Sequence, residues 1–312
     1  MDAIIATNVT QKFGSVTAVD QVTLSVKQGE IFGLLGPDGA GKTTVMRLLA
    51  GLMVPSAGEV WVHGCNTVNA VDKLRQHISY MPQRFGLYLD LTVQENIDFY
   101  ADLYNVPNNI RKEKIPELLS FSNMKPFRDR QAKNLSGGMK QKLALACALI
   151  HTPRVLLLDE PTNGVDPLSR RDFWRILYRL LEDKVTIFVS TAYLDEAERC
   201  DRIGLLHRGK LILTGKPDEI KAQMRGVLLE IRCSAPRQLL PVVIADFRPL
   251  SAGLFGNKIH MVMLGDPAHM LDEVKDKLAR SGVEAEVAII APSLEDVFIS
   301  LIMPLEGGGA GG

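Results

Sequence analysis

The spacing of apolar and polar residues over the first fifty positions predicts short strands followed by a helix. Residues Ile4–Val9 and Val22–Val26 have the composition of strands, and a turn at Phe13 separates them. A short apolar strand over Glu30–Leu35 runs directly into a glycine-rich segment, after which Val45–Leu52 has the pattern of a helix. A strand, a glycine loop and a helix in this order are the context that a phosphate-binding loop requires.

The next part of the chain, from about residue 85 to residue 150, is rich in helical patterns. Three helices are predicted, at Val93–Leu103, Arg111–Phe121 and Met139–Ile150. Pro107 and a turn at Ser136 mark the loops between them. We interpret this stretch as a helical subdomain inserted into an α/β core.

Two short and continuous apolar runs follow, at Val155–Leu158 and Val185–Val189. Parallel strands that are buried on both faces have this uninterrupted apolar pattern. A helix over Leu168–Leu181 is predicted between them. These elements resume the α/β core and favour a parallel sheet at its centre.

The pattern changes again near Gly226. The predicted elements there are strands at Val227–Cys233, Lys258–Leu264 and Glu284–Ile290, and helices at Leu239–Phe247, Ala268–Ser281 and Leu294–Ile302. This alternation predicts a small α+β domain, for which a split βαβ arrangement is a candidate. The last residues are almost all glycine, which predicts a flexible tail. We therefore expect domains at 1–225 and 226–303, followed by a tail at 304–312.

The composition narrows the classes of function. Lys and Arg together number 36, as do Asp and Glu, so the formal net charge is zero and no basic field argues for a nucleic-acid partner. The four cysteines form no CxxC pair, which favours reduced structural thiols over a zinc site or disulfides. We find neither a secretory signal nor a run of about 18 apolar residues. Any membrane role is therefore expected to act through a partner.

The glycine-rich segment matches the pattern G-x-x-x-x-G-K-[ST]. Its backbone N–H groups can wrap around phosphates, and the helix that follows directs its positive dipole end at them. Lys42 supplies a charge to the β and γ phosphates, and Thr43 offers a hydroxyl to Mg²⁺. The residues expected around the nucleotide are Gly36, Pro37, Asp38, Gly39, Ala40, Gly41, Lys42, Thr43 and Thr44.

The apolar run at Leu156–Leu158 ends in two acids, Asp159 and Glu160. Such a pair is common at the end of a strand, and it gains meaning here from the presence of Lys42. Asp159 is expected to hold Mg²⁺ through water, and Glu160 to orient or deprotonate the attacking water. ATP and Mg²⁺ are therefore the expected ligands.

The segment Leu135–Gln141 resembles the signature sequence of ABC ATPases. A serine and two glycines that open a helix form an anion site. The resemblance implies that Ser136, Gly137 and Gly138 cap the γ-phosphate bound by the opposite subunit. Met139 stands where this family more often has Gln, but the anion-binding residues are intact.

Three further positions match features of the same family. Gln83 resembles the glutamine that touches Mg²⁺ and the attacking water, Asp166 lies in a segment similar to the loop that crosses the dimer interface, and Phe13 stands where an aromatic ring stacks on adenine. Taken singly, each also has a structural interpretation. The implied catalytic residues are Glu160 and Gln83. The implied metal ligands are Thr43, Gln83 and Asp159.

The resemblance covers residues 4–226 and implies a fold. That fold is a P-loop NTPase core of the ABC-ATPase type, with an antiparallel β subdomain and an inserted helical subdomain. The small α+β domain follows this core.

One position departs from the family pattern. The family usually has a histidine where this chain has Ala192, and that histidine contacts the γ-phosphate. Alanine neither donates nor accepts a hydrogen bond, and losing one positioned polar group typically costs about 10²–10³ in rate. The site is therefore either weakened, or compensated locally by Thr191 or Tyr193, or paired with a different subunit whose histidine is intact.

Several segments are similar to the drug-export branch of the family, including Tyr193–Glu198 and Pro292–Phe298. The resemblance implies an ATPase subunit that pairs with a second ABC ATPase subunit and energises an integral-membrane permease from the inner face of the cell membrane. Closure of the dimer over ATP would be the working step. Apolar residues after Gln83 are candidates for the permease contact or for helical-subdomain core, namely Phe85, Leu87, Tyr88 and Leu91.

Two other functions compete with this hypothesis. The first is a soluble ABC ATPase that acts on ribosomes or DNA, which the neutral charge and the single ATPase unit disfavour. The second is a regulatory module that binds ATP without hydrolysing it. Ala192 favours this hypothesis, whereas the presence of Glu160 argues against it. The C-terminal domain is expected to be regulatory or to form a dimer contact.

Overall fold

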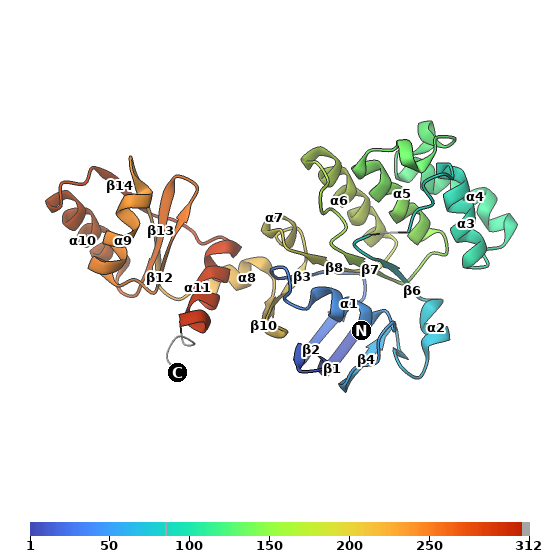
Figure 1. Ribbon diagram of the computed structural model, residues 1–312, viewed down its shortest axis with the longest axis horizontal. Coiled ribbons are helices and arrows are strands. Elements are labelled where there is room, and N and C mark those ends of the chain that lie inside the picture. Colours follow the sequence, from blue (N-terminus) through green and yellow to red (C-terminus); the bar gives the residue numbers. More distant parts are fainter. Residues whose placement is uncertain (85, 308–312) are drawn as a thin grey trace. The chain divides into compact units, whose positions relative to one another are not determined.

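The computed structural model describes residues 1–84 and 86–307, with the backbone alone for 302–307. The chain forms two compact units, Met1–Lys216 and Pro217–Gly312 (Figure 1). The division between them lies before helix α8 (Pro217–Ala222), whereas the sequence placed it after residue 225. The reason is tertiary, because α8 packs against the last helix, α11 (Leu294–Gly307).

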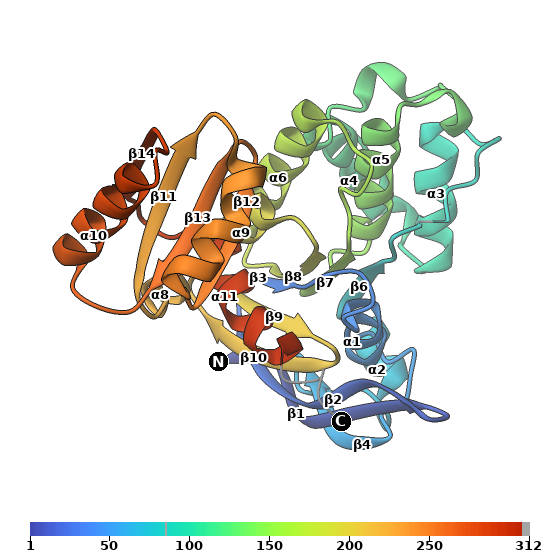
Figure 2. The same cartoon turned by 60° about the vertical axis from the view of Figure 1, so that its left-hand side comes forward.

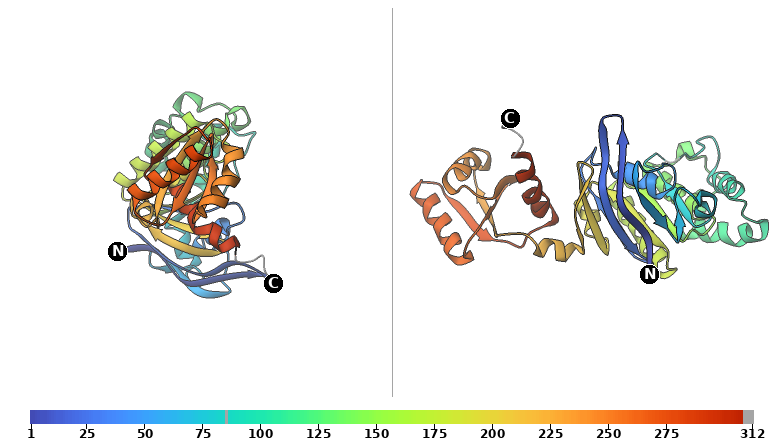
Figure 3. Two further views of the ribbon diagram at one scale, coloured as in Figure 1. Left: turned by 90° about the vertical axis from the view of Figure 1, so that its left-hand side faces the viewer. Right: turned by 90° about the horizontal axis from the view of Figure 1, so that it is seen from below.

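The first unit contains an antiparallel sheet with the strand order β2-β1-β4-β5. Its strands are β1 (Asp2–Phe13), β2 (Val16–Lys27), β4 (Ala57–Val62) and β5 (Cys65–Asn66). The first two are longer than predicted and form a long ribbon, drawn in dark blue in Figure 3. Strand β1 pairs with β2 on one edge and with β4 on the other, with several register shifts. These pairings satisfy the hydrogen-bonding groups of the β1 backbone beyond its apolar centre.

A six-stranded sheet forms the centre of the first unit, in the order β10-β9-β3-β8-β7-β6. Its strands are β3 (Ile31–Leu35), β6 (Ile78–Met81), β7 (Val155–Asp159), β8 (Thr186–Thr191), β9 (Arg202–His207) and β10 (Lys210–Gly215). The five strands from β9 to β6 pair in parallel, and β10 is an antiparallel edge. The predicted parallel strands β7 and β8 are buried at every position, as their apolar runs indicated.

Two helices of the first unit follow strands of the central sheet along the chain. Helix α1 (Lys42–Leu49) follows β3 directly, and α6 (Pro167–Glu182) lies between β7 and β8 in the chain. The remaining helices are α2 (Val71–Arg75), α3 (Val93–Leu103), α4 (Asn108–Phe121), α5 (Gly137–Leu149) and α7 (Leu194–Ala197). Helix α3 has the predicted bounds because Thr92 and Glu95 form a capping box at its first turn.

The second unit is a four-stranded antiparallel sheet with two helices packed on one face. Its elements, besides α8 and α11, are β11 (Val227–Cys233), α9 (Pro236–Phe247), β12 (Ser251–Phe255), β13 (Lys258–Met263), α10 (Pro267–Arg280) and β14 (Ala285–Ile289). Figure 2 shows the strands in the order β14, β11, β13, β12. Helix α9 links β11 to β12 with β13 between them, which is a split βαβ unit. The sequence missed β12 because Gly253 interrupts its short apolar pattern.

Helix α11 continues through Gly307, so it is longer than the predicted 294–302 helix. The predicted tail therefore overlaps this helix at 304–307, and its remaining residues lie outside the described part of the chain. Among the described residues, no helix is long and apolar enough to span a bilayer.

Candidate nucleotide site

The glycine loop connects the end of β3 to the start of α1 and wraps around the amine of Lys42. The Lys42 Nζ atom donates to the carbonyl oxygens of Gly36, at 2.9 Å, and Pro37, at 3.1 Å. At Gly41 the backbone has φ +105°, and an added Cβ would lie 2.3 Å from the Ala18 carbonyl oxygen. Only glycine fits this position, so the loop holds its closed curve around the amine.

Glu160 meets Lys42 from the opposite side of the site. Its Oε1 atom lies 2.9 Å from Lys42 Nζ, and its Oε2 atom accepts hydrogen bonds from Gln83 Nε2 at 2.9 Å and Asn163 Nδ2 at 3.3 Å. The Glu160 backbone adopts φ +47°, and its N–H donates to Ser190 Oγ at 3.0 Å. This left-handed conformation turns the chain at the end of β7 and directs the carboxylate at the glycine loop.

Asp159 is the last residue of β7 and is only 1% exposed. Its carboxylate accepts hydrogen bonds from Ser190 Oγ at 2.6 Å and Tyr80 Oη at 3.3 Å. Burial, together with the charge of Asp159, raises the pKa of Tyr80 to about 12, so the phenol stays protonated and donates. Two hydroxyl donors thus satisfy the oxygens of this buried carboxyl group.

A pocket of about 380 Å³ lies in front of these groups. It is lined by Ala18, Asp38, Gly39, Gly41, Lys42, Thr43, Thr44, Gln83, Glu160 and Asn163. The lining combines a cation and the N-terminus of a helix with hydroxyl and amide groups, which suits a polyphosphate. Thr43 and Gln83 line the pocket, whereas Asp159 is buried and does not. Their hydroxyl, amide and carboxylate oxygens are the kind of ligand that Mg²⁺ prefers, so this set of residues fits the ion.

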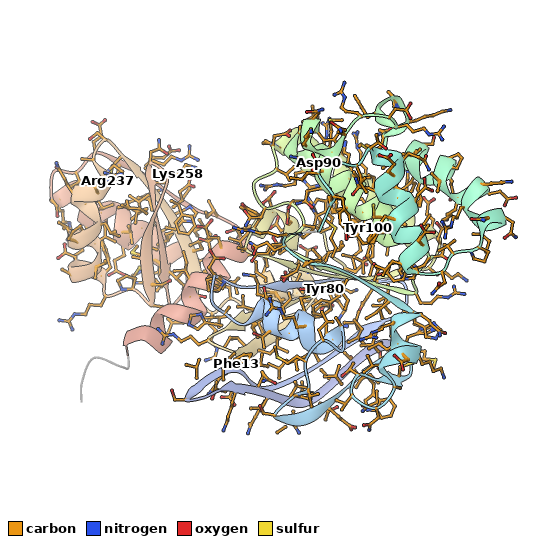
Figure 4. All side chains as sticks on the ribbon, turned by 45° about the vertical axis from the view of Figure 1, so that its right-hand side comes forward. Phe13, Tyr80, Asp90, Tyr100, Arg237 and Lys258 are labelled. Carbon is orange, nitrogen blue, oxygen red and sulfur yellow. The ribbon has the colours of Figure 1, made fainter. Side chains whose placement is uncertain are left out.

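Three other features expected at the nucleotide, Phe13, the signature residues 136–138 and Asp166, do not line this pocket. Phe13 ends β1, does not line the pocket, and is 49% exposed; Figure 4 labels it together with Tyr80 of β6. Ser136 caps helix α5, where its Oγ atom accepts from the Met139 N–H, and Asp166 caps α6 by accepting from the Ser169 N–H. None of the signature residues 136–138 lines the pocket of its own chain.

The signature glycine Gly138 has a structural reason of its own. A Cβ atom there would lie 2.4 Å from the side chain of Ser169, so the start of α5 packs closely on α6. This contact joins the signature segment to the segment that Asp166 ends. The signature segment and the segment that ends at Asp166 are therefore neighbours in the first unit.

Sequence reasoning gave no role to several polar groups around the two acids. Tyr80, Ser190 and Asn163 all hydrogen-bond Asp159 or Glu160. Tyr80 and Ser190 lie on strands that flank β7, so the parallel register brings them to its end. Asn163 follows Glu160 by three residues and begins the segment that resembles the interface loop, and these were the signals in the sequence.

Comparison with known proteins places this geometry in a family. The family model described as ABC transporter matches residues 19–163. The Nod factor export ATP-binding protein I of Rhizobium sp. (strain N33) is 35% identical over 302 residues, which cover 96% of both chains. This chain belongs to the ABC transporter ATP-binding family.

Another relative differs in length. The probable multidrug ABC transporter ATP-binding protein YbhF of Escherichia coli (strain K12) is 48% identical over 220 residues, or 70% of this chain. The match spans only 38% of the YbhF chain. The part of this ABC protein that matches YbhF thus spans less than half the length of that relative.

Solved structures agree with the family. The ATP-binding cassette MJ0796, in a dimeric post-hydrolysis state with ADP and Pi, is 29% identical with a TM-score of 0.62, covering 68% of this chain and 98% of the cassette. A structure of the ATP-binding subunit of an ABC transporter gives a TM-score of 0.65 at 28% identity, covering 71% and 92% of the two chains. The ABC cassette fold therefore accounts for the first unit, and the expected ABC-type fold class is confirmed.

Proposed function

We propose that this chain binds MgATP and hydrolyses ATP to drive export through a membrane permease. The observation that carries the proposal is the meeting of Lys42, Glu160 and Gln83 in one pocket. A cation for the phosphates and an adjacent carboxylate for the attacking water are the two groups that ATP hydrolysis requires.

The ion pair between Lys42 and Glu160 supports an order of events. Phosphate oxygens would compete with Glu160 for the Lys42 ammonium, whose carbonyl partners Gly36 and Pro37 keep it in place. Binding of ATP would therefore release one carboxylate oxygen while Gln83 and Asn163 retain the other. The released oxygen is then free to accept a proton from water as a general base.

Mg²⁺ would be held by Thr43, Asp159 and Gln83. When bound, the ion neutralises charge on the phosphate oxygens. The hydroxyl donors on Asp159, from Ser190 and Tyr80, would fix the direction of that carboxylate.

The expected partners follow from what the pocket lacks. Ser136 and the two glycines after it do not line the pocket of their own chain, which supports a site completed by a second ABC ATPase subunit. The relatives are named for multidrug and Nod factor export, which favours an export permease as the membrane partner. The chain would then work at the inner face of the cell membrane.

The candidates for the permease contact are at least partly exposed at Leu87, Tyr88 and Leu91. Phe85, the fourth candidate, lies outside the described residues.

The test is ATP hydrolysis by the full chain, alone and assembled with its permease in lipid, for the parent, Lys42→Ala and Glu160→Gln. We expect both variants to lose at least about 10²-fold in turnover, since each removes a charged group placed at the reaction. We also expect Glu160→Gln to bind ATP at least as tightly as the parent, because it removes the anion that competes for Lys42.

The same measurements separate the alternatives. Equal turnover in the parent and in Glu160→Gln would favour the regulatory module, which Ala192 keeps open. Turnover that rises with ribosomes and not with the permease would favour the soluble ABC ATPase. Normal turnover by Lys42→Ala would contradict the proposed site itself.

A further inference from the structure

The residue that directly follows β8, Ala192, has no polar side chain. Ala192 is exposed and ends in a methyl group. Two neighbouring hydroxyls could compensate, those of Thr191 and Tyr193. The Thr191 hydroxyl is buried and donates to Glu196 Oε2 at 2.8 Å. It is therefore committed to a structural contact.

The Tyr193 hydroxyl, by contrast, reaches a residue that lines the pocket. Its Oη atom donates to Asn163 Oδ1 at 3.4 Å, and Asn163 Nδ2 donates to Glu160 Oε2 at 3.3 Å. Phenol, amide and carboxylate thus form a chain that ends on the proposed general base. With its oxygen facing the phenol, the amide must direct its NH₂ group at the carboxylate.

Tyr193 is itself held in place by two further contacts. Its backbone N–H donates to Thr191 Oγ1 at 3.0 Å, and the guanidinium carbon of Arg170 lies 4.2 Å from the centre of its ring. The buried carboxylate of Glu196 accepts from both Thr191 and Thr162. Glu196 therefore ties the loop that bears Asn163 to the end of β8, and the two ends of the hydrogen-bond chain stay in register.

We propose that Tyr193 is a positioning residue that orients Glu160 through Asn163, in place of a polar side chain at position 192. This inference rests on the proposed function. Tyr193 transfers no proton in this role; its hydroxyl fixes the Asn163 amide, and the amide holds one carboxylate oxygen while the other is released from Lys42.

The test is a double-mutant cycle on ATP turnover, using Tyr193→Phe, Asn163→Ala and the double variant in the full chain assembled with its permease. Tyr193→Phe keeps the ring on Arg170 and removes only the hydroxyl. We expect kcat to fall about three- to tenfold with little change in KM for ATP, because one neutral hydrogen bond that orients the base is lost. In the Asn163→Ala background, the same change should have no further effect on kcat.

Tyr178→Phe is the matched control. Its hydroxyl donates to the Arg199 carbonyl oxygen at 3.2 Å, away from the pocket residues, so kcat should stay at the parent value. Equal kcat values for the parent and Tyr193→Phe would overturn the inference. So would an undiminished effect of Tyr193→Phe in the Asn163→Ala background, since the two residues would then act independently.

The parent and Lys42→Ala rates separate this inference from the proposed function. If the parent exceeds the Lys42→Ala background, the ATPase assignment stands and the cycle alone decides the role of Tyr193. If the parent only equals that background, the proposed function fails and the role of Tyr193 fails with it.

Discussion

At the scale of single residues, Glu196 shows how a buried charge can hold two loops together. The residue is 1% exposed, accepts hydrogen bonds from Thr162 and Thr191, and lies 3.5 Å from Arg170 Nε. Its hydroxyl donors and the guanidinium offset the cost of removing the carboxylate from water. The loop after Glu160 and the end of β8 therefore depend on a side chain outside the pocket.

Replacing Glu196 by alanine should destabilise the first unit strongly. Two buried hydroxyls would lose their acceptor and Arg170 would lose a buried ion-pair partner, and breaking such a buried pair costs about 3–5 kcal/mol. The free energy of unfolding, measured by urea titration with tryptophan fluorescence, checks this value. Asp195→Ala is the control, since Asp195 pairs with the same Arg170 while exposed, and it should cost less than about 1 kcal/mol. Equal losses in the two variants would contradict the role given to Glu196.

At the scale of elements, strand register gathers a charged cluster on one face of the second unit. Glu230 of β11 lies opposite His260 of β13, and Arg232 lies opposite Lys258. The Glu230 carboxylate accepts from Arg232 at 2.7 Å and Lys258 at 2.8 Å, while His260 Nδ1 lies 2.7 Å from Asp296 of α11. The cluster thus links the sheet to the last helix.

The cluster predicts a loss of stability at low pH. The hydrogen bond from Lys258, followed by those from Arg232 and His260, lowers the pKa of Glu230 from its ordinary 4.5 to about 2. A carboxyl group whose pKa is lower in the folded state stabilises that state above its unfolded pKa. This stabilisation should disappear as pH falls from about 4.5 to about 2.

Hydrogen exchange of β11 in the full chain checks this expectation, with protection factors compared between pH 6 and pH 2.5. In the parent, β11 should lose protection at pH 2.5. In Glu230→Gln, β11 should be less protected than in the parent at pH 6, and its protection should differ less between pH 6 and pH 2.5. Glu284→Gln, an exposed position in the same unit, should follow the parent. A parent whose β11 protection does not change over this range would contradict the assignment to Glu230.

At the scale of the whole molecule, the two units have separate cores. The strands of both sheets in the first unit, its apolar core and all the pocket residues lie before Pro217. Among the described residues, the apolar core cluster of the second unit is built from residues after Gly226. The division into units therefore separates the nucleotide chemistry from the C-terminal module.

A chain that ends at Lys216 should fold and bind ATP like the full chain. Trp61 and Trp174 both lie in the first unit, so their fluorescence reports its unfolding, and calorimetry with MgATP reports binding. A chain that ends at residue 225 is the control. The chain that ends at residue 225 should be no more stable than the chain that ends at Lys216, because it keeps α8 but loses α11, the helix on which α8 packs. Loss of ATP binding on truncation at Lys216 would contradict the independence of the first unit.

Local chemistry explains why much of this fold could be predicted. Continuous apolar runs predicted β7 and β8, and the helical pattern at Val93–Leu103 predicted α3, which the structure shows capped at Thr92. Strands β6 and β10 were not predicted, because each is short and takes its strand conformation from pairing with a neighbouring strand, β7 for β6 and β9 for β10.

The sequence by itself determined the glycine loop, the acids at the end of β7 and the family. These depend on residues that are adjacent in the chain, where glycine sterics and helix dipoles act locally. Only the tertiary structure decided that Glu160 pairs with Lys42, that Thr191 is committed to Glu196, and that Tyr193 reaches Asn163. The contacts of Glu160 and Tyr193 join segments that are separate in the chain, and the pairing of β3, β7 and β8 in the parallel sheet brings those segments together. Thr191 and Glu196 meet where the chain turns from β8 into α7.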